Sequence, residues 1–148
     1  MVHALEEIHR LLKPSGRLID IHPLAEASPV EIHRGTKTEL VGNLLVKQWC
    51  MDYQEADQAL TEITRRGLFA VEREGMFDSL THYGSLPEMR TSLLESVDKF
   101  AREAGSKAEA KAEVEALAAR AEELTRPAVS GAELTIRERT HIRRFKPT

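Results

Sequence analysis

The carboxylate of Asp20 and the imidazole of His22 lie two positions apart, at the end of a short apolar segment. Residues two apart on a β-strand share a face, so these two side chains would lie side by side. A histidine beside a carboxylate can act as a general base near neutral pH. The simpler interpretation is a solvated pair at a strand end, and we favour it. We nevertheless keep Asp20 and His22 as candidate substrate-binding residues, and we assign no catalytic residue.

Trp49 and Cys50 lie in an apolar run that covers residues 44–51. The indole of Trp49 is a further candidate substrate-binding group, in a small-molecule pocket beneath a hairpin predicted just before it. A thiol can serve as a nucleophile, but a cysteine in apolar surroundings is far more often an inert structural residue. We therefore expect Cys50 to be structural.

The six histidines raise the question of a metal site. Metal-binding histidines and cysteines recur at short fixed spacings, such as His-x-x-x-His on a helix or Cys-x-x-Cys in a turn. Neither spacing occurs in this sequence. We predict that the chain has no metal site.

Basic side chains alternate near the C-terminus, at Arg137, Arg139, His141 and Arg143. On a strand they would share one face, which could bind phosphate or nucleic acid. The alternative is a solvated basic face paired with the many acidic residues. We prefer this alternative because the net charge is −3 and only 5% of the residues are aromatic. We therefore expect no nucleic-acid partner.

The composition is that of a folded domain, with 148 residues, 41% hydrophobic and 30% charged. A chain of this length can bury a substantial core, and we treat residues 1–148 as a single domain. Its one cysteine excludes an intrachain disulfide and fits a reducing compartment. No stretch approaches the roughly 18 consecutive apolar residues of a membrane span. We predict a cytoplasmic protein with no membrane partner.

Hydrophobic periodicity and turn residues divide the chain into helices and strands. Helices are predicted at 4–13, 52–67, 85–104 and 106–125, strands at 17–22, 68–81 and 134–145, a hairpin between 30 and 45, and a loop at 127–131. Gly35 supplies the turn of the hairpin. The apolar residues Leu18, Ile19 and Ile21 show little alternation, which predicts a strand covered on both faces.

Local motifs mark the ends of the predicted helices. Asp52, Ser85 and Ser106 are each followed three residues later by glutamate, which is the spacing of a capping box at a helix start. Gly67 lies where a C-cap glycine is expected. Gly105 predicts a tight connection between the last two helices, which would then form an antiparallel helical hairpin over residues 85–125.

The stretch "ALEEIHRLLKPSGRLIDIHPL" combines a helix, a turn at Pro14 and Gly16, and strand 17–22. It resembles the class I S-adenosylmethionine-dependent methyltransferases, in which a helix ending in a Lys-Pro turn leads into the fifth strand of the sheet. Ser15 stands where that family usually has a glycine. Two weaker matches follow in the family's order: "ALTEITRRGLFAVE" resembles the next helix and sixth strand, and "HIRRFKP" resembles the seventh strand.

The resemblance implies an α+β fold derived from an α/β family: a small mixed sheet flanked by helices, with the β-hairpin and the helical hairpin 85–125 as insertions. It also implies that strand 134–145 runs antiparallel to strand 17–22 and lies between it and strand 68–81. The family binds its cofactor through an earlier glycine-rich loop, and this chain has no Gly-x-Gly-x-Gly. We expect the C-terminal half of a methyltransferase-like domain, with no cofactor-binding residues of its own.

Such a half domain would leave the outer edge of strand 17–22 without a neighbour, and an exposed apolar edge favours pairing with another chain. We expect a homodimer or a separate partner chain that covers this edge, although the insertions folding over it are a rival. The leading hypothesis is a methyltransferase-like protein that is not catalytic alone and acts by association. One alternative is a methyltransferase whose S-adenosylmethionine site a partner polypeptide completes, with Asp20 and His22 near the acceptor. A second alternative is a small-molecule-binding module around Trp49.

Overall fold

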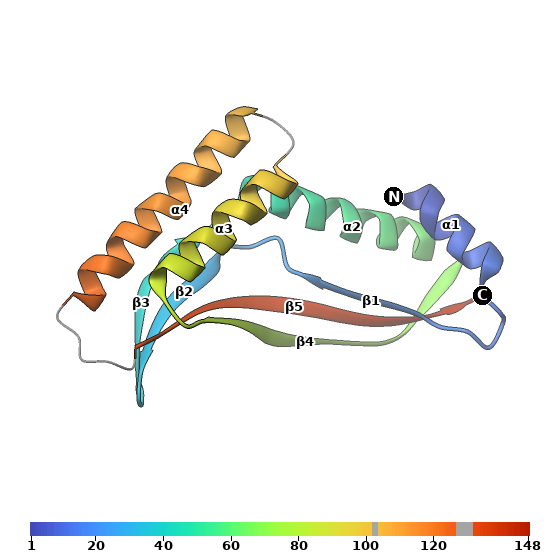
Figure 1. Cartoon of the computed structure of the whole chain (residues 1–148). Helices are drawn as coiled ribbons and strands as arrows, with labels where there is room; N and C mark the ends of the chain where they lie inside the picture. Colours follow the sequence, from blue (N-terminus) through green and yellow to red (C-terminus); the bar gives the residue numbers. More distant parts are fainter. Residues whose placement is uncertain (102–103, 127–131) are drawn as a thin grey trace. The chain divides into compact units, whose positions relative to one another are not determined.

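The computed structural model describes residues 1–101, 104–126 and 132–148, so the predicted loop at 127–131 lies outside the described residues (Figure 1). The helices are α1 (Val2–Leu11), α2 (Lys47–Arg65), α3 (Leu86–Phe100) and α4 (Ala104–Thr125). The strands are β1 (Leu18–Pro23), β2 (Ser28–Arg34), β3 (Lys37–Leu44), β4 (Phe69–Tyr83) and β5 (Glu133–Pro147). This mixture of helices and a sheet confirms the α+β class.

The strands are hydrogen-bonded in the order β1, β5, β2, β3, and β4 also pairs with β5. The predicted antiparallel pairing of β1 with β5 is confirmed, with a register that runs from Leu18 opposite Phe145 to Pro23 opposite Thr140. The expected mixed sheet is wrong, because the sheet is antiparallel. The cause is the course of β5, which pairs with both β1 and β4 and so keeps those two strands from pairing with each other.

The chain divides into two compact units. The first comprises Met1–Ala25, Met51–Asp78 and Arg139–Thr148, and the second comprises Glu26–Cys50 and Ser79–Glu138. Three elements, α2, β4 and β5, contribute residues to both units. The single domain predicted for residues 1–148 stays a prediction.

The core of the first unit joins α1 and α2 to the ends of β4 and β5. Its members are Leu5, Ala59, Leu60, Ile63, Phe69 and Phe145. The rings of Phe69 and Phe145 meet edge to face, with centroids 6.4 Å apart. Ile63 is fully buried, and Ala59 and Leu60 lie beside it on the apolar face of α2. This core holds α2 over one face of β1 and β5, where the polar residues described below lie.

The two ends of α2 differ in how well the sequence predicts them. Gly67 has φ +71°, its N–H donates to the carbonyl of Thr64, and the N–H of Leu68 donates to the carbonyl of Ile63. These two bonds form a Schellman motif, so the predicted C-cap is confirmed. The start predicted at Asp52 is wrong, because the helix begins at Lys47. Residues 47–51, which complete the apolar run before Asp52, are therefore helical.

β1 is covered on one face only. Leu18, Asp20 and His22 are partly buried, whereas Ile19 and Ile21 remain 50% and 56% exposed. The prediction of a strand covered on both faces is therefore wrong. The first unit places α1 and α2 over one face, and the isoleucines of the other face lie in solvent.

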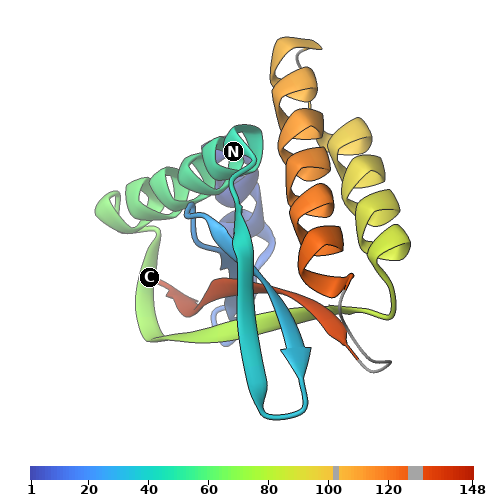
Figure 2. The same ribbon diagram turned by 90° about the vertical axis from the view of Figure 1, so that its left-hand side faces the viewer.

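The second unit contains the predicted hairpin, formed by β2 and β3 (Figure 2). Gly35 has φ +59° and makes the turn, as predicted. A register shift between Val30 and Glu31 marks a β-bulge, opposite Val41 and beside Gly42. The bulge bends the hairpin, and Val30 and Val41 are both buried in the core of this unit.

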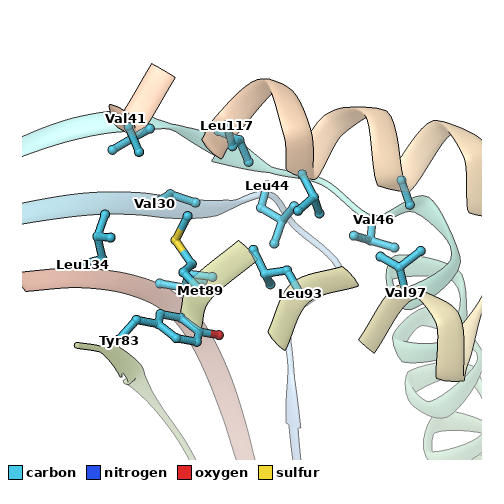
Figure 3. Close-up of a cluster of buried hydrophobic side chains, with 14 of the residues drawn as sticks. Val30, Val41, Leu44, Val46, Tyr83, Met89, Leu93, Val97, Leu117 and Leu134 are labelled. Atoms are coloured by element: carbon cyan, nitrogen blue, oxygen red, sulfur yellow. The ribbon is translucent and has the colours of Figure 1, made fainter. Parts of the chain in front are cut away.

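The helices α3 and α4 pack side by side and antiparallel in the second unit (Figures 1 and 2). Arg90 near the start of α3 pairs with Glu115 of α4, whereas Asp98 near the end of α3 pairs with Lys107. The antiparallel helical hairpin predicted over residues 85–125 is confirmed. Figure 3 shows the buried side chains of α3 and α4 packed against those of the β2–β3 hairpin. Met89 of α3 is among them and is completely buried.

Capping chemistry predicts the start of α3 but not that of α4. The Ser85 hydroxyl accepts a hydrogen bond from the N–H of Glu88, and the Glu88 carboxylate accepts one from the N–H of Gly84. The cap predicted at Ser106 is wrong, because α4 begins at Ala104. Gly105 therefore lies inside the helix, where no positive φ and no crowding demand a glycine.

Candidate functional site

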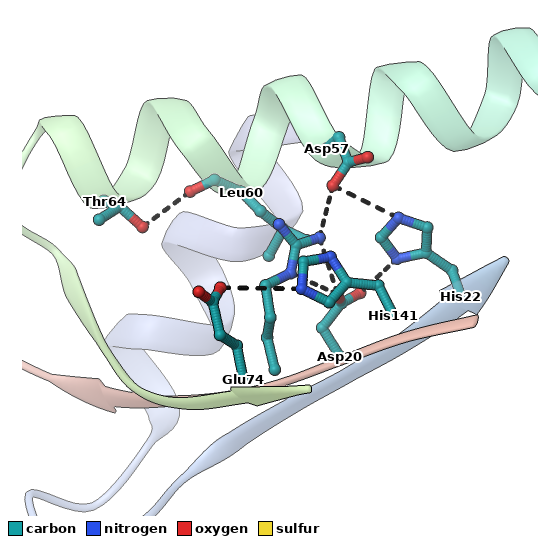
Figure 4. A network of polar contacts seen from close by, with 8 residues as sticks. Asp20, His22, Asp57, Leu60, Thr64, Glu74 and His141 are labelled. Carbon is teal, nitrogen blue, oxygen red and sulfur yellow. Dashed lines mark hydrogen bonds and ion pairs between the residues drawn. The ribbon is translucent and has the colours of Figure 1, made fainter. Parts of the chain in front are cut away.

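A cluster of polar side chains lies between α2 and the strands of the first unit (Figure 4). We call it the polar cluster, and its members are Asp20, His22, Asp57, Glu74, His141 and Arg143. β1 supplies two members at alternate positions, and the register of β5 sets Arg143 opposite Asp20 and His141 opposite His22. The predicted sharing of one strand face by Asp20 and His22 is confirmed.

Arg143 lies at the centre of the polar cluster, with only 11% of its side chain exposed. Its Nη2 donates to Asp20 at 3.0 Å and to Asp57 at 2.6 Å, and its Nε donates to Asp20 at 3.1 Å. Its guanidinium carbon also lies 5.9 Å from the centre of the Phe145 ring. A buried charge needs such partners, because an unpaired one is strongly unfavourable. Arg143 therefore links α2 to β1.

The solvated basic face expected on β5 is wrong at Arg143, which is buried. Elsewhere on that face the expected pairing with acidic residues is present. In the second unit, Arg137 donates to Glu31 at 2.7 Å. In the first unit, His141 lies 3.7 Å from Glu74. The alternating pattern thus reflects internal ion pairs.

His22 is held between two carboxylates. Its Nδ1 lies 3.0 Å from an oxygen of Asp20, and its Nε2 lies 3.5 Å from an oxygen of Asp57. A carboxylate only accepts hydrogen bonds, so Nδ1 carries a proton toward Asp20. Nε2 is buried and is close enough to Asp57 for an ion pair, but it makes no hydrogen bond of good geometry. The ring of Tyr53 lies nearby, with centroids 6.3 Å apart.

The burial of these side chains overturns the expectation of a solvated pair at a strand end. Only 16% of the Asp20 side chain and 10% of the His22 side chain are exposed. The sequence could not show this cover, because Asp57 of α2 comes 35 residues after His22. In this arrangement the carboxylates of Asp20 and Asp57 are bound by Arg143, so the cluster secures the helix to the sheet. A proton transfer at Nε2 of His22 would require Asp57 to move.

An open groove of about 350 Å³ lies beside the polar cluster in the first unit. It is lined by Leu60, Thr61, Thr64, Arg65, Val71, Glu74, Arg143 and Phe145. The hydroxyl of Thr64 donates to the carbonyl of Leu60 and keeps its lone pairs for another donor. The groove therefore offers apolar walls with a polar rim, which suits a small ligand that has both characters.

Trp49 belongs to the second unit and packs against its core. Its Nε1 is buried and has no hydrogen-bond partner. Trp49 lines neither the 350 Å³ groove nor a groove of about 540 Å³ between α3 and α4. Its proposed role in small-molecule binding stays a prediction.

Cys50 is half-buried in the second unit. Burial, with a smaller contribution from the negative charge of Glu113, raises the pKa of its thiol. The thiolate is the nucleophilic form, so these surroundings disfavour reactivity. This result agrees with the structural role expected for Cys50.

Sequence reasoning missed Asp57 as a partner of Asp20 and His22. The available signal was helical spacing, because Asp57 lies three and seven residues before Leu60 and Thr64 and shares their face. A carboxylate on a buried helix face needs a cation, and Arg143 is that cation. The pattern could have indicated a charged site beneath α2, but not which strand supplies the partner.

In residues 1–101, 104–126 and 132–148, no group of three or more histidine, cysteine or acidic side chains is arranged to hold a metal ion. No helix within that part of the chain is long and apolar enough to cross a membrane. Comparison of the chain with protein-family profiles, with curated proteins and with solved structures finds no match. We therefore infer a function for this chain from its sequence and from the geometry of the first unit.

Proposed function

We propose that this chain is a methyltransferase-like half domain that acts by association with another chain and is not catalytic alone. Its support in the fold is the strand order. β5 pairs with both β1 and β4, and runs antiparallel to β1, which is the arrangement that the resemblance implies. A cytoplasmic location, which the single cysteine favours, belongs to the same proposal.

The observation that carries the proposal is the edge of β1. Among the described strands, β1 pairs with β5 alone. Ile19 and Ile21, at its centre, are half exposed on the face away from α2. Natural proteins usually protect such edges with charges, bulges or covering segments, because unpaired backbone groups beside apolar side chains promote pairing with another chain. The edge of β1 is thus the association surface.

Calorimetric titration of the purified chain with S-adenosylmethionine tests this function. The proposal expects no cofactor for the isolated chain, and therefore no binding heat up to about 1 mM ligand, which corresponds to a binding free energy weaker than about −4 kcal/mol. Clear one-site binding would overturn the proposal, because the chain would then form a cofactor site without the missing half.

A second candidate is a methyltransferase whose active site a partner polypeptide completes. The specific observation in its favour is the polar cluster, which sets His22 against Asp20 and whose members Glu74 and Arg143 line a groove able to hold a small acceptor. Methyl transfer depends largely on positioning donor and acceptor together, which requires both halves. In this candidate Asp20 orients His22, Asp57 moves away from the Nε2 of His22, and that nitrogen accepts a proton from the acceptor.

The second candidate predicts methyl transfer from S-adenosylmethionine when the chain is added to a cell extract. His22→Gln would lower that transfer by about 10²-fold or more, the usual contribution of a general base. Glu55→Gln, on an exposed position of α2, is the matched control and would leave the transfer unchanged. Equal transfer with and without the added chain would contradict this candidate.

A further inference from the structure

The edge of β1 presents a specific set of backbone groups. The N–H of Leu24 donates to the carbonyl of Arg139 at 2.8 Å, which continues the β1–β5 register by one pair. In an antiparallel ladder, hydrogen-bonded and non-hydrogen-bonded pairs alternate. The backbone groups of Asp20 and His22 therefore point toward β5. Those of Ile19 and Ile21 point toward the open edge.

The face of β1 away from α2 is apolar at its centre. Ile21 lies directly opposite Ile142 of β5, and these side chains are 56% and 37% exposed. Directly opposed residues share a face, so the two isoleucines form one patch that reaches the edge of the sheet. Ile19 lies on the same face and is 50% exposed. The open edge thus joins unpaired backbone groups to an apolar surface.

We propose that a second copy of this chain pairs with β1, antiparallel, about a two-fold axis at Ile21. This inference rests on the proposed function, and it identifies the associating chain and the register. A two-fold interface is self-complementary, so one edge serves both copies. The N–H of Ile21 would donate to the carbonyl of Ile21 in the copy, and the carbonyl of Ile21 would accept from the N–H of that same residue. The Ile21 side chains would meet, and the two patches with Ile142 would become continuous.

Charge selects this register. Two antiparallel registers, one centred on Asp20 and one on Ile21, pair nearly the whole of β1 with β1 of the copy. Both registers place the exposed isoleucines of the two copies on the same face of the joined sheet. The first sets Asp20 against Asp20 of the copy, and like charges directly opposite are unfavourable. The second sets Asp20 against His22 of the copy, and His22 against Asp20. In this register the N–H of Ile19 donates to the carbonyl of Pro23 of the copy, and the carbonyl of Ile19 receives no bond in return because proline has no N–H.

Cysteine cross-linking tests the register. Ile21→Cys and Ile19→Cys are each made with Cys50→Ser, which removes the native thiol, and the chains are oxidised at about 100 μM. In the proposed pairing the two Cα atoms at position 21 lie about 5.5 Å apart, within the span of a disulfide. Those at position 19 lie more than about 13 Å apart. We expect a disulfide-linked dimer for Ile21→Cys and none for Ile19→Cys. Equal linking at both positions would overturn the register.

Sedimentation of the unmodified chain gives an independent result. We expect a dimer that Ile21→Lys dissociates, whereas Leu11→Lys, on an exposed position of α1, leaves it intact. A monomer at 100 μM with no cross-link would overturn the pairing with a second copy, and a different chain would then be the partner. The titration with S-adenosylmethionine is a separate readout. Binding of that cofactor overturns the proposed function whether or not the chain dimerises.

Discussion

The two faces of β1 and β5 in the first unit reverse the usual placement of polar and apolar residues. Beneath α2, the covered face carries Asp20, His22 and Arg143, whereas the opposite face exposes Ile19 and Ile21. Buried charges are tolerated because each has an oppositely charged neighbour. The exposed isoleucines at the sheet edge have no such compensation among the residues that the structure describes. The contrast teaches that charges can be buried where they are paired within the chain, and it singles out the opposite face as the one that our proposal assigns to contact with a second copy.

The largest effect on the free energy of unfolding is expected when Arg143 and Arg144, neighbours on opposite faces of β5, are replaced separately. Arg143→Met would leave Asp20 and Asp57 without their shared cation, and we expect a loss of about 3 kcal/mol in the free energy of unfolding. Arg144→Met removes an ion pair with Glu72 on the other face and would cost about 0–1 kcal/mol. Urea unfolding of both variants measures the difference. Equal losses would contradict the distinction between the faces.

A smaller effect is expected at Asp57. Asp57→Asn keeps an oxygen that can accept from Arg143, and Asp20 still balances the charge of that arginine. We expect a loss of about 1 kcal/mol by thermal or urea unfolding. Glu55→Gln, exposed on the same helix, is the control and would stay within about 0.5 kcal/mol. A loss at Asp57 as large as that of Arg143→Met would show that Asp20 alone does not compensate the guanidinium.

The pH dependence of stability tests the ion pairs of the opposite face. The hydrogen bond from Arg17 to Glu72 is the main cause that lowers the pKa of that carboxyl, and Arg144 adds to it. A lowered pKa in the folded state contributes stability above the unfolded value of about 4.3, and this is lost as the pH falls through the folded pKa. We therefore expect Glu72→Gln to reduce the slope of stability against pH below about pH 4.5. An unchanged acid limb would contradict the pairing.

The smallest expected effect is at Ile19. Ile19→Thr removes apolar surface that is half exposed, so the free energy of unfolding of the dilute chain should change by less than about 0.5 kcal/mol. The variant is compared with the unmodified chain at a concentration too low for association. A loss of 2 kcal/mol or more would mean that this face is already packed within a single chain.

The sequence predicted those features that local chemistry determines. Gly67 and Gly35 adopt the positive φ values that their turns require, and Ser85 caps α3 through its own hydroxyl. The helical hairpin was also predicted from residues that are near one another in the sequence. The pairing of β1 with β5 was implied by the resemblance to the methyltransferases and not by a local signal.

Predictions failed where distant contacts decide the structure. Helix α2 begins at Lys47 because Val46 is buried and Trp49 packs against the core of the second unit, so the capping signal at Asp52 is overridden. The burial of Arg143 depends on Asp57, a residue 86 positions away. No local pattern contains that information. The candidate pair Asp20 and His22 was therefore found, but the groups that cover it were not.

Amide hydrogen exchange at two protein concentrations tests the central claim, that β1 is an association edge, most directly. In the dilute chain the amides of Ile19 and Ile21 should exchange rapidly, while those of Asp20 and His22, bonded to β5, stay protected. At high concentration the account predicts protection of Ile19 and Ile21 as well. Rapid exchange of these two amides at every concentration would contradict self-association, and their protection in the dilute chain would contradict an open edge.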